Sequence, residues 1–166
     1  PTAPAHHFGD ARGLLTSLAT EAFRQFGNAL TEADAAAEPT ARVRAQGIAY
    51  VEFALAHPAL FDLMWRRALL DLDDPEFRAV SRRAFALLEA GVAGREPRAA
   101  NPPELVDPRT IASWSIVHGF ARLVLDGAFG LDREEAAESA RAALPHVLDC
   151  LDIAPGGSVA EVASLG

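Results

Sequence analysis

Apolar residues recur at the spacing of an α-helix along most of this 166-residue chain. The clearest run follows Asp10, a residue that can cap a helix, and has apolar side chains four apart at Leu14, Leu18, Ala22, Phe26 and Leu30. The chain holds 35 Ala and 20 Leu, whereas Val, Ile and Thr together number 20, and this balance favours helices over strands. We therefore predict an all-α fold.

Capping residues and prolines divide the rest of the chain into further helices. An aspartate stands at each of the three clearest helix starts, and a proline follows it in the first two: Asp74, Asp107 and Asp132. We expect helices over 11–30, 40–57, 58–70, 75–91 or 75–94, 108–129 and 133–151. These boundaries predict one helical domain over residues 10–153, with a flexible tail over 154–166.

The net charge of −8 argues by itself against a protein that coats nucleic acid or an acidic membrane. The acidity is uneven, because residues 131–166 carry a net charge of −5 and residues 1–30 a net charge of zero. Cys150 is the only cysteine, which excludes an internal disulfide and a multi-cysteine metal site. No apolar run reaches the roughly 18 residues of a membrane span. We expect a soluble, cytoplasmic protein without a cofactor.

The segment 108–129 is apolar almost all the way round, so it needs neighbours on two sides. The next segment carries small residues at helical spacing, which permits close approach of another helix. We predict a homodimer built as a four-helix arrangement of these two segments from each chain. The predicted interface residues are Phe120, Val124, Ala136, Ala140, Ala143, Val147 and Leu151. The alternative is a central helix buried inside a monomer.

Large, adaptable side chains from several of the predicted helices form a second candidate group. They are Tyr50, Phe53, Phe61, Met64, Trp65, Phe85, Leu88, Trp114 and His118. As single residues they are more often plain core, but as a set they fit an apolar pocket for a small effector. Tyr50 and His118 are the candidates for orienting that effector.

Catalytic and metal chemistry lack a specific signal. No two histidines stand four apart with a carboxylate between them, so no metal site is predicted. A triad of Ser115, His118 and Asp126 is discounted, because one helix cannot aim all three groups at one reacting atom. We therefore predict that the protein is not an enzyme.

Three segments resemble one family of proteins. The run from Trp114 to Gly119 is similar to the W-x-x-x-H-G signature of a C-terminal domain in TetR-type transcriptional regulators. Residues 5–15 resemble the end of the recognition helix and the start of the connecting helix in that family. Residues 57–64, which begin with His-Pro, resemble a third segment of it. The three occur in the family's order and together span the chain.

The resemblance implies a helical regulatory domain preceded, over residues 1–9, by the end of a truncated helix-turn-helix unit. The residues that it implies for DNA binding are Thr2, His6, His7 and Arg12. It further implies a homodimeric regulator, a repressor in particular, that releases operator DNA when a small apolar effector binds. The alternative is a helical small-molecule-binding protein without a DNA function.

Overall fold

A computed structural model describes residues 11–94, 107–130 and 132–150, and every regular element within these ranges is helical. The elements are α2 (Ala11–Ala36), η1 (Pro39–Ala41), α3 (Arg42–Ala56), α4 (Pro58–Trp65), η2 (Arg67–Leu69), α5 (Pro75–Ala93), α6 (Pro108–Leu125) and α7 (Arg133–Asp149). The predicted all-α fold is confirmed. No helix in the described part of the chain is long and apolar enough to span a membrane.

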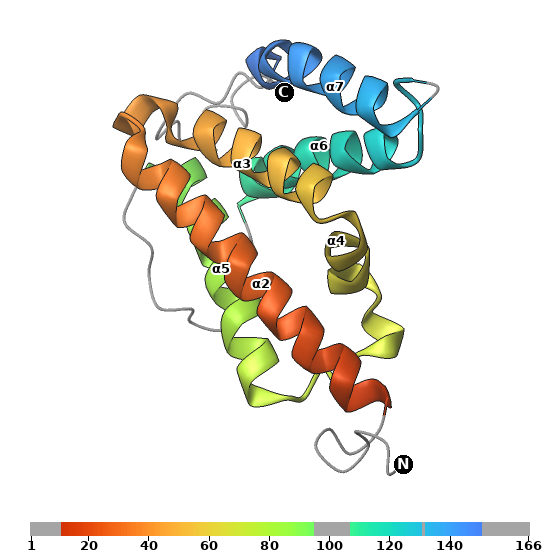
Figure 1. The fold of residues 1–166 in the computed structure, drawn as a ribbon. Helices are drawn as coiled ribbons and strands as arrows, with labels where there is room; N and C mark the ends of the chain where they lie inside the picture. Colours follow the sequence, from red (N-terminus) through yellow and green to blue (C-terminus); the bar gives the residue numbers. More distant parts are fainter. Residues whose placement is uncertain (1–10, 95–106, 131, 151–166) are drawn as a thin grey trace, which may run out of the picture.

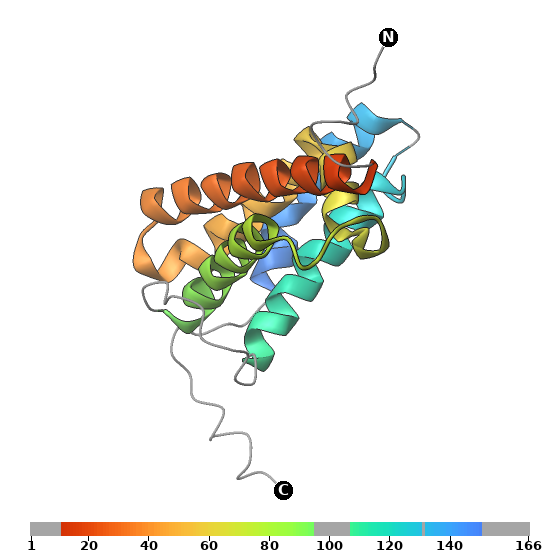
Figure 2. The ribbon, with the colours of Figure 1, turned by 90° about the horizontal axis from the view of Figure 1, so that it is seen from below.

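Helix α3 is the centre of the fold, because it contacts α2, α4, α5, α6 and α7. Helices α2 and α5 run side by side, and α6 and α7 lie together beyond α3 (Figures 1 and 2). Figure 1 shows the start of α2 and the helix α7 at opposite ends of the molecule. Helix α6 contacts α3, α5 and α7, so other helices of the same chain bury more than one of its sides.

The predicted N-caps are confirmed at three helices. The side chain of Asp74 accepts a hydrogen bond from Phe77 N at 2.8 Å, and that of Asp132 accepts one from Glu135 N at 2.9 Å. Asp107 likewise accepts from the backbone N–H two residues on, at 2.8 Å. Each carboxylate satisfies a backbone donor that the first helical turn leaves unpaired.

Three helix ends differ from the sequence-based prediction by four residues or more. Helix α2 continues to Ala36 rather than ending at Leu30, because the Ala-rich residues that follow have high helix propensity. Helix α4 ends at Trp65, and a separate 3-10 turn covers part of the remaining predicted length. Helix α6 ends at Leu125, just before Gly127, whose φ of +84° is the conformation that a glycine adopts most readily.

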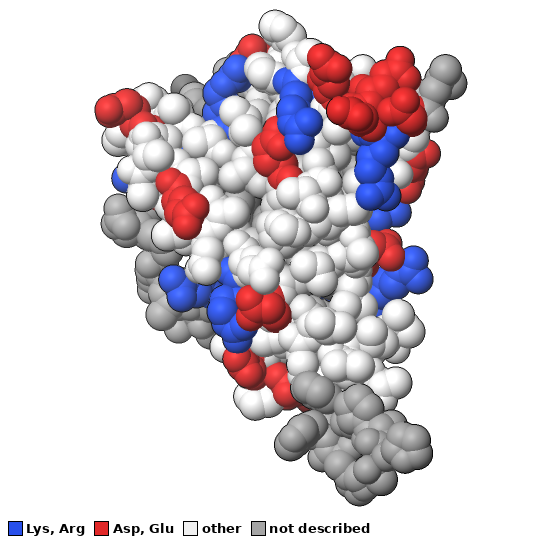
Figure 3. All heavy atoms as spheres, viewed as in Figure 1, with Lys and Arg blue, Asp and Glu red and all other residues white. Residues whose placement is uncertain are grey.

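Acidic side chains are concentrated near the start of α7 on the face that Figure 3 shows. Acidic side chains gather in Figure 3 over the upper right of the molecule, where Figure 1 places the start of α7. The first turn of α7 carries Glu134 and Glu135, and acidic side chains at this position also favour the helix dipole.

Candidate functional site

A buried polar network lies where α3 faces α6. The phenol of Tyr50 is fully buried and accepts a hydrogen bond from Trp114 Nε1 at 3.1 Å. The same hydroxyl lies 2.9 Å from His118 Nδ1, one helical turn beyond Trp114. Burial raises the pKa of Tyr50, so its hydroxyl stays protonated and can donate to the imidazole. The neutral imidazole then carries its proton on Nε2.

Aromatic rings from α4 and α5 pack against this network. The ring of Phe61 lies 5.4 Å from that of His118, and the Trp65 ring lies 5.0 Å from it on a nearly perpendicular plane. The ring of Trp114 lies 5.5 Å from Trp65 and 5.6 Å from Phe85. The structure thus brings together six of the nine residues predicted to bind a ligand. They fill their space with one another, since Tyr50 and Phe61 are 0% exposed.

The other three predicted ligand residues lie at the edges of this cluster. Met64 is 2% exposed and belongs to the same core, and the ring of Phe53 lies 5.3 Å from that of Phe26. Leu88 is partly buried on α5 and lines a separate cleft, described below. No group of three or more metal-ligating side chains occurs among the residues that the structure describes.

The ionisation of His118 makes stability depend on pH. Burial, and to a lesser extent the positive charge of Arg122, lower the pKa of His118 below its ordinary value of 6.5. Between the folded-state pKa and 6.5 the unfolded chain binds the proton more strongly, so stability is complete above pH 6.5 and falls as the pH decreases. Protonation at Nδ1 would also place two N–H donors on the Tyr50 oxygen.

We predict that His118→Asn removes this part of the pH dependence, because Asn can still accept from Tyr50 but does not titrate in this range. Urea unfolding at several pH values between 5 and 7.5 measures how the free energy of unfolding depends on pH. The slope of the free energy of unfolding against pH should be smaller in the variant than in the parent chain. Equal slopes would mean that His118 does not contribute to the pH dependence of stability.

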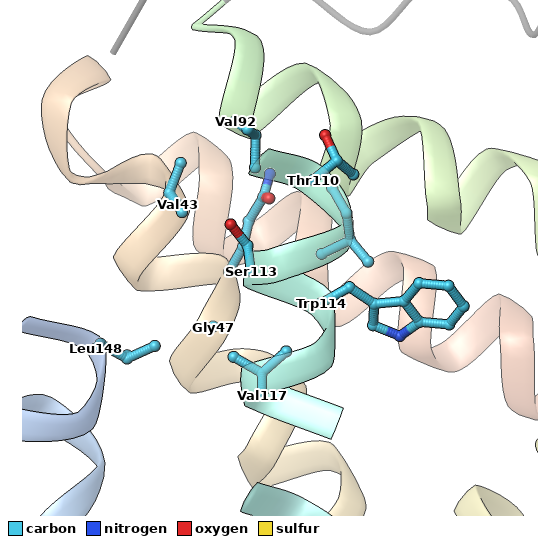
Figure 4. Close-up of a pocket in the computed structure, with 10 residues that line it drawn as sticks. Val43, Gly47, Val92, Thr110, Ser113, Trp114, Val117 and Leu148 are labelled. Atoms are coloured by element: carbon cyan, nitrogen blue, oxygen red, sulfur yellow. The ribbon is translucent and has the colours of Figure 1, made fainter. Parts of the chain in front are cut away.

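A cleft lies on the other side of Trp114, between α3, α5, α6 and α7 (Figure 4). With its open mouth it encloses about 350 Å³ of empty space. Most of its lining side chains are apolar, and the polar ones are an amide and two hydroxyls. The lining residues are Val43, Gln46, Gly47, Leu88, Val92, Thr110, Ser113, Trp114, Val117 and Leu148.

Sequence reasoning identified Leu88 and Trp114 but missed the rest of this cleft. The prediction was based on large aromatic side chains, whereas the cleft is lined mainly by valines, leucines and small polar residues. One signal was present, because Thr110, Ser113 and Val117 lie on one face of an otherwise apolar helix. Gly47 is a second signal, since a Cβ there would lie 2.9 Å from Leu148 Cδ2, and α3 and α7 come close at this point.

Three of the residues predicted to bind DNA, Thr2, His6 and His7, lie outside the described residues. The fourth, Arg12, donates to the Leu70 carbonyl through Nε at 3.0 Å and through Nη2 at 2.7 Å. A third hydrogen bond, next to these two, runs from the Asp71 N–H to Thr16 Oγ1 at 2.8 Å. The start of α2 is thereby fixed to the segment between α4 and α5.

The residues predicted for a dimer interface are largely covered within the chain. Phe120, Val124, Ala136 and Ala140 are each at most 6% exposed. Ala143 and Val147 are half-buried and pack on the core, and Leu151 lies outside the described residues. Helix α6 instead exposes Ile111 to 49% and Leu123 to 52%.

The chain matches the family model described as "Tetracyclin repressor-like, C-terminal domain" over residues 43–147. It is also similar to a solved structure of a protein with unknown function from Rhodococcus sp. RHA1. The sequences are 27% identical, the TM-score is 0.66, and the similarity covers 89% of this chain and 78% of the other. No curated protein matches the chain. The family match extends from α3 into α7, and the chain therefore belongs to the family of tetracyclin repressor-like C-terminal domains.

Proposed function

We propose that this chain is the regulatory part of a homodimeric DNA-binding transcriptional regulator, a repressor, that releases its operator when a small effector binds. The observation that carries the proposal is the family match over residues 43–147. Thr2, His6, His7 and Arg12 are the residues proposed to contact DNA. The feature that supports effector binding is the cleft beside the aromatic cluster around Tyr50, and Trp114 belongs to both the cleft and the cluster.

A physical route connects these sites to the start of α2. Helix α4 carries Phe61 and Trp65, whose rings contact His118 on α6. The chain then leaves α4 and reaches Leu70 and Asp71, which are bonded to the first turns of α2. We call these contacts the α2 latch; its members are Arg12, Thr16, Leu70 and Asp71. A shift of α4 would therefore move the start of α2. An effector causes this shift if it binds one position of α4 more tightly than the other.

DNA binding is tested with the complete protein that contains this chain. Its affinity for the DNA upstream of its own gene should fall steeply as the salt concentration rises, because Arg and other cations release counterions from phosphates. Fluorescence anisotropy at several salt concentrations measures the slope. Absent or salt-insensitive binding would contradict the proposed regulator and favour a ligand-binding protein without a DNA function.

We predict that Arg12→Ala loosens the α2 latch. The substitution removes both bonds to the Leu70 carbonyl, and a hydrogen bond of this kind contributes about 1 kcal/mol. Amide hydrogen exchange at Asp71 should become roughly threefold to tenfold faster. Unchanged exchange would mean that the latch is held without Arg12.

The matched control is Arg24→Ala, a substitution of another exposed arginine of α2 that pairs with Glu21 and Glu76 instead. It should leave exchange at Asp71 unchanged. The salt slope of DNA binding separates the two roles of Arg12. A slope that decreases by about one in Arg12→Ala supports the proposed phosphate contact, and an unchanged slope contradicts it.

The proposed dimer is best formed by the exposed face of α6 rather than by the covered residues of α6 and α7. Ile111 and Leu123 are large apolar residues that the chain leaves about half exposed. Gly119 lies between them on the same helix, and no atom lies within 4 Å of the position that its Cβ would take, so a partner helix can approach closely. Two copies of this face related by a two-fold axis would bury the leucines against each other.

A further inference from the structure

The cleft between α3, α5, α6 and α7 has no ionisable side chain among its lining residues. An unpaired charge is costly to bury, so a cleft of this composition selects against ions. The lining therefore suits a small, uncharged molecule with an apolar body.

One hydroxyl in this lining lacks a hydrogen-bond partner. Thr110 is 1% exposed, and its Oγ1 atom is buried and has no partner. The other polar side chains of the lining are engaged, because Ser113 Oγ donates to Arg109 O at 2.7 Å and Gln46 Nε2 bonds to Asp34 and to Leu87 O. Leaving a buried hydroxyl unpaired costs free energy that a ligand with a polar oxygen would recover.

We propose that this cleft binds an uncharged small molecule with an aliphatic body and one polar oxygen, and that this oxygen bonds to Thr110 Oγ1. The binding site stands on the cleft and the unpartnered hydroxyl, and only its role as the effector site rests on the proposed function. A short-chain alcohol has the required chemistry. Its body would lie against Val92, Val117 and Leu148, which line the cleft together with Thr110 (Figure 4), and its oxygen would bond to Thr110 Oγ1.

Entry of the ligand requires the Leu148 side chain to move. Within the cleft, the space that admits a water-sized molecule amounts to about 20 Å³, which is little more than one water. The Leu148 side chain lies against Gly47 and Val117 at the place where α7 approaches α3. A change of its rotamer, or a small outward shift of α7, enlarges the cleft. Binding therefore couples directly to the packing of α7.

The probes are 1-hexanol, n-hexane and hexanoate, each titrated into the 166-residue chain by isothermal calorimetry. We expect 1-hexanol and n-hexane to bind, and hexanoate to bind at least about tenfold more weakly than 1-hexanol because its charge finds no partner in the lining. Binding of hexanoate as tight as that of 1-hexanol would overturn the assigned ligand class. Binding of neither neutral probe would overturn the site.

Thr110→Val keeps the shape of the side chain and removes its hydroxyl. We expect this variant to bind 1-hexanol about threefold to tenfold more weakly and to bind n-hexane as tightly as the parent chain. Without ligand its melting temperature should rise by about 2–4 °C, because an unpaired buried hydroxyl is gone. An equal loss of affinity for both probes, or no loss for 1-hexanol, would overturn the bond to Thr110.

Thr20→Val is the matched control. Thr20 is also buried, at 5% exposed, but its hydroxyl donates to Thr16 O at 2.8 Å and it lies outside the cleft. This variant should bind 1-hexanol as the parent chain does and should not gain stability. A gain in melting temperature equal to that of Thr110→Val would mean that the unpaired hydroxyl is not the cause.

The two proposals can fail separately. If 1-hexanol binds and Thr110→Val weakens it, but operator binding by the complete protein is absent, the site stands and the regulator is overturned. If the complete protein binds its operator with a steep salt dependence but none of the probes enters the cleft, the regulator stands and this site is overturned.

Discussion

Phe61→Ala is expected to lower the free energy of unfolding by about 3–5 kcal/mol. Phe61 is 0% exposed, and its ring lies 5.9 Å from Tyr50, 6.2 Å from Trp65 and 5.4 Å from His118. The large cost follows from the lost burial and from the cavity that remains at the centre of the cluster. For a chain of this length it corresponds to a decrease in melting temperature of about 8–15 °C, measured by circular dichroism.

Leu18→Ala is the matched control for Phe61→Ala. Leu18 is 44% exposed on α2, so its truncation should change the free energy of unfolding by no more than about 0.5 kcal/mol. If both variants lost a similar, small amount of stability, the aromatic cluster would not be the rigid core that the ring distances indicate. A loss confined to Phe61→Ala supports its place between α4 and α6.

Ala140→Glu and Leu123→Glu are expected to act in opposite ways on folding and assembly. Ala140 is 0% exposed, so a carboxylate there is placed in the core without a cation and should cost at least about 3 kcal/mol of stability. Leu123 is 52% exposed, so Leu123→Glu should keep the helix content and the melting temperature close to those of the parent chain. If the exposed face of α6 forms the proposed dimer, Leu123→Glu should yield monomers.

Sedimentation velocity together with circular dichroism separates these outcomes. Leu18→Glu, which places the same charge on an exposed leucine of α2, is the control and should leave the association state unchanged. A parent chain that sediments as a monomer would contradict the proposed dimer. A Leu123→Glu variant that remains dimeric would place the interface on another surface.

The local sequence predicted the helices and most of their starts, because the signals involved act within one helical turn. The caps at Asp74, Asp107 and Asp132 accept bonds from donors two or three residues away. The extension of α2 to Ala36 was not predicted, because the apolar stripe ends at Leu30 and only the helix propensity of the Ala-rich residues carries the helix further.

The candidate sites were predicted only where residue type was itself informative. Large aromatic side chains pack together in most cores, so the cluster around Tyr50 and Trp114 was visible as a set. The cleft was not predicted, because its aliphatic and small polar residues form a lining only where four helices meet. The unpaired state of Thr110 Oγ1 likewise depends on every atom around it.

The sequence by itself determined an all-helical chain, the aspartate caps, the resemblance to TetR-type regulators and the concentration of acidic residues toward its end. Only the tertiary structure decided which apolar face of α6 is covered, that Arg12 holds Leu70, and that the cleft lies beside Trp114. The physical reason is the distance along the chain over which each kind of interaction acts. Helix formation and capping depend on neighbours within about four residues, whereas burial and hydrogen-bond pairing depend on segments that are distant in the chain and adjacent only after folding.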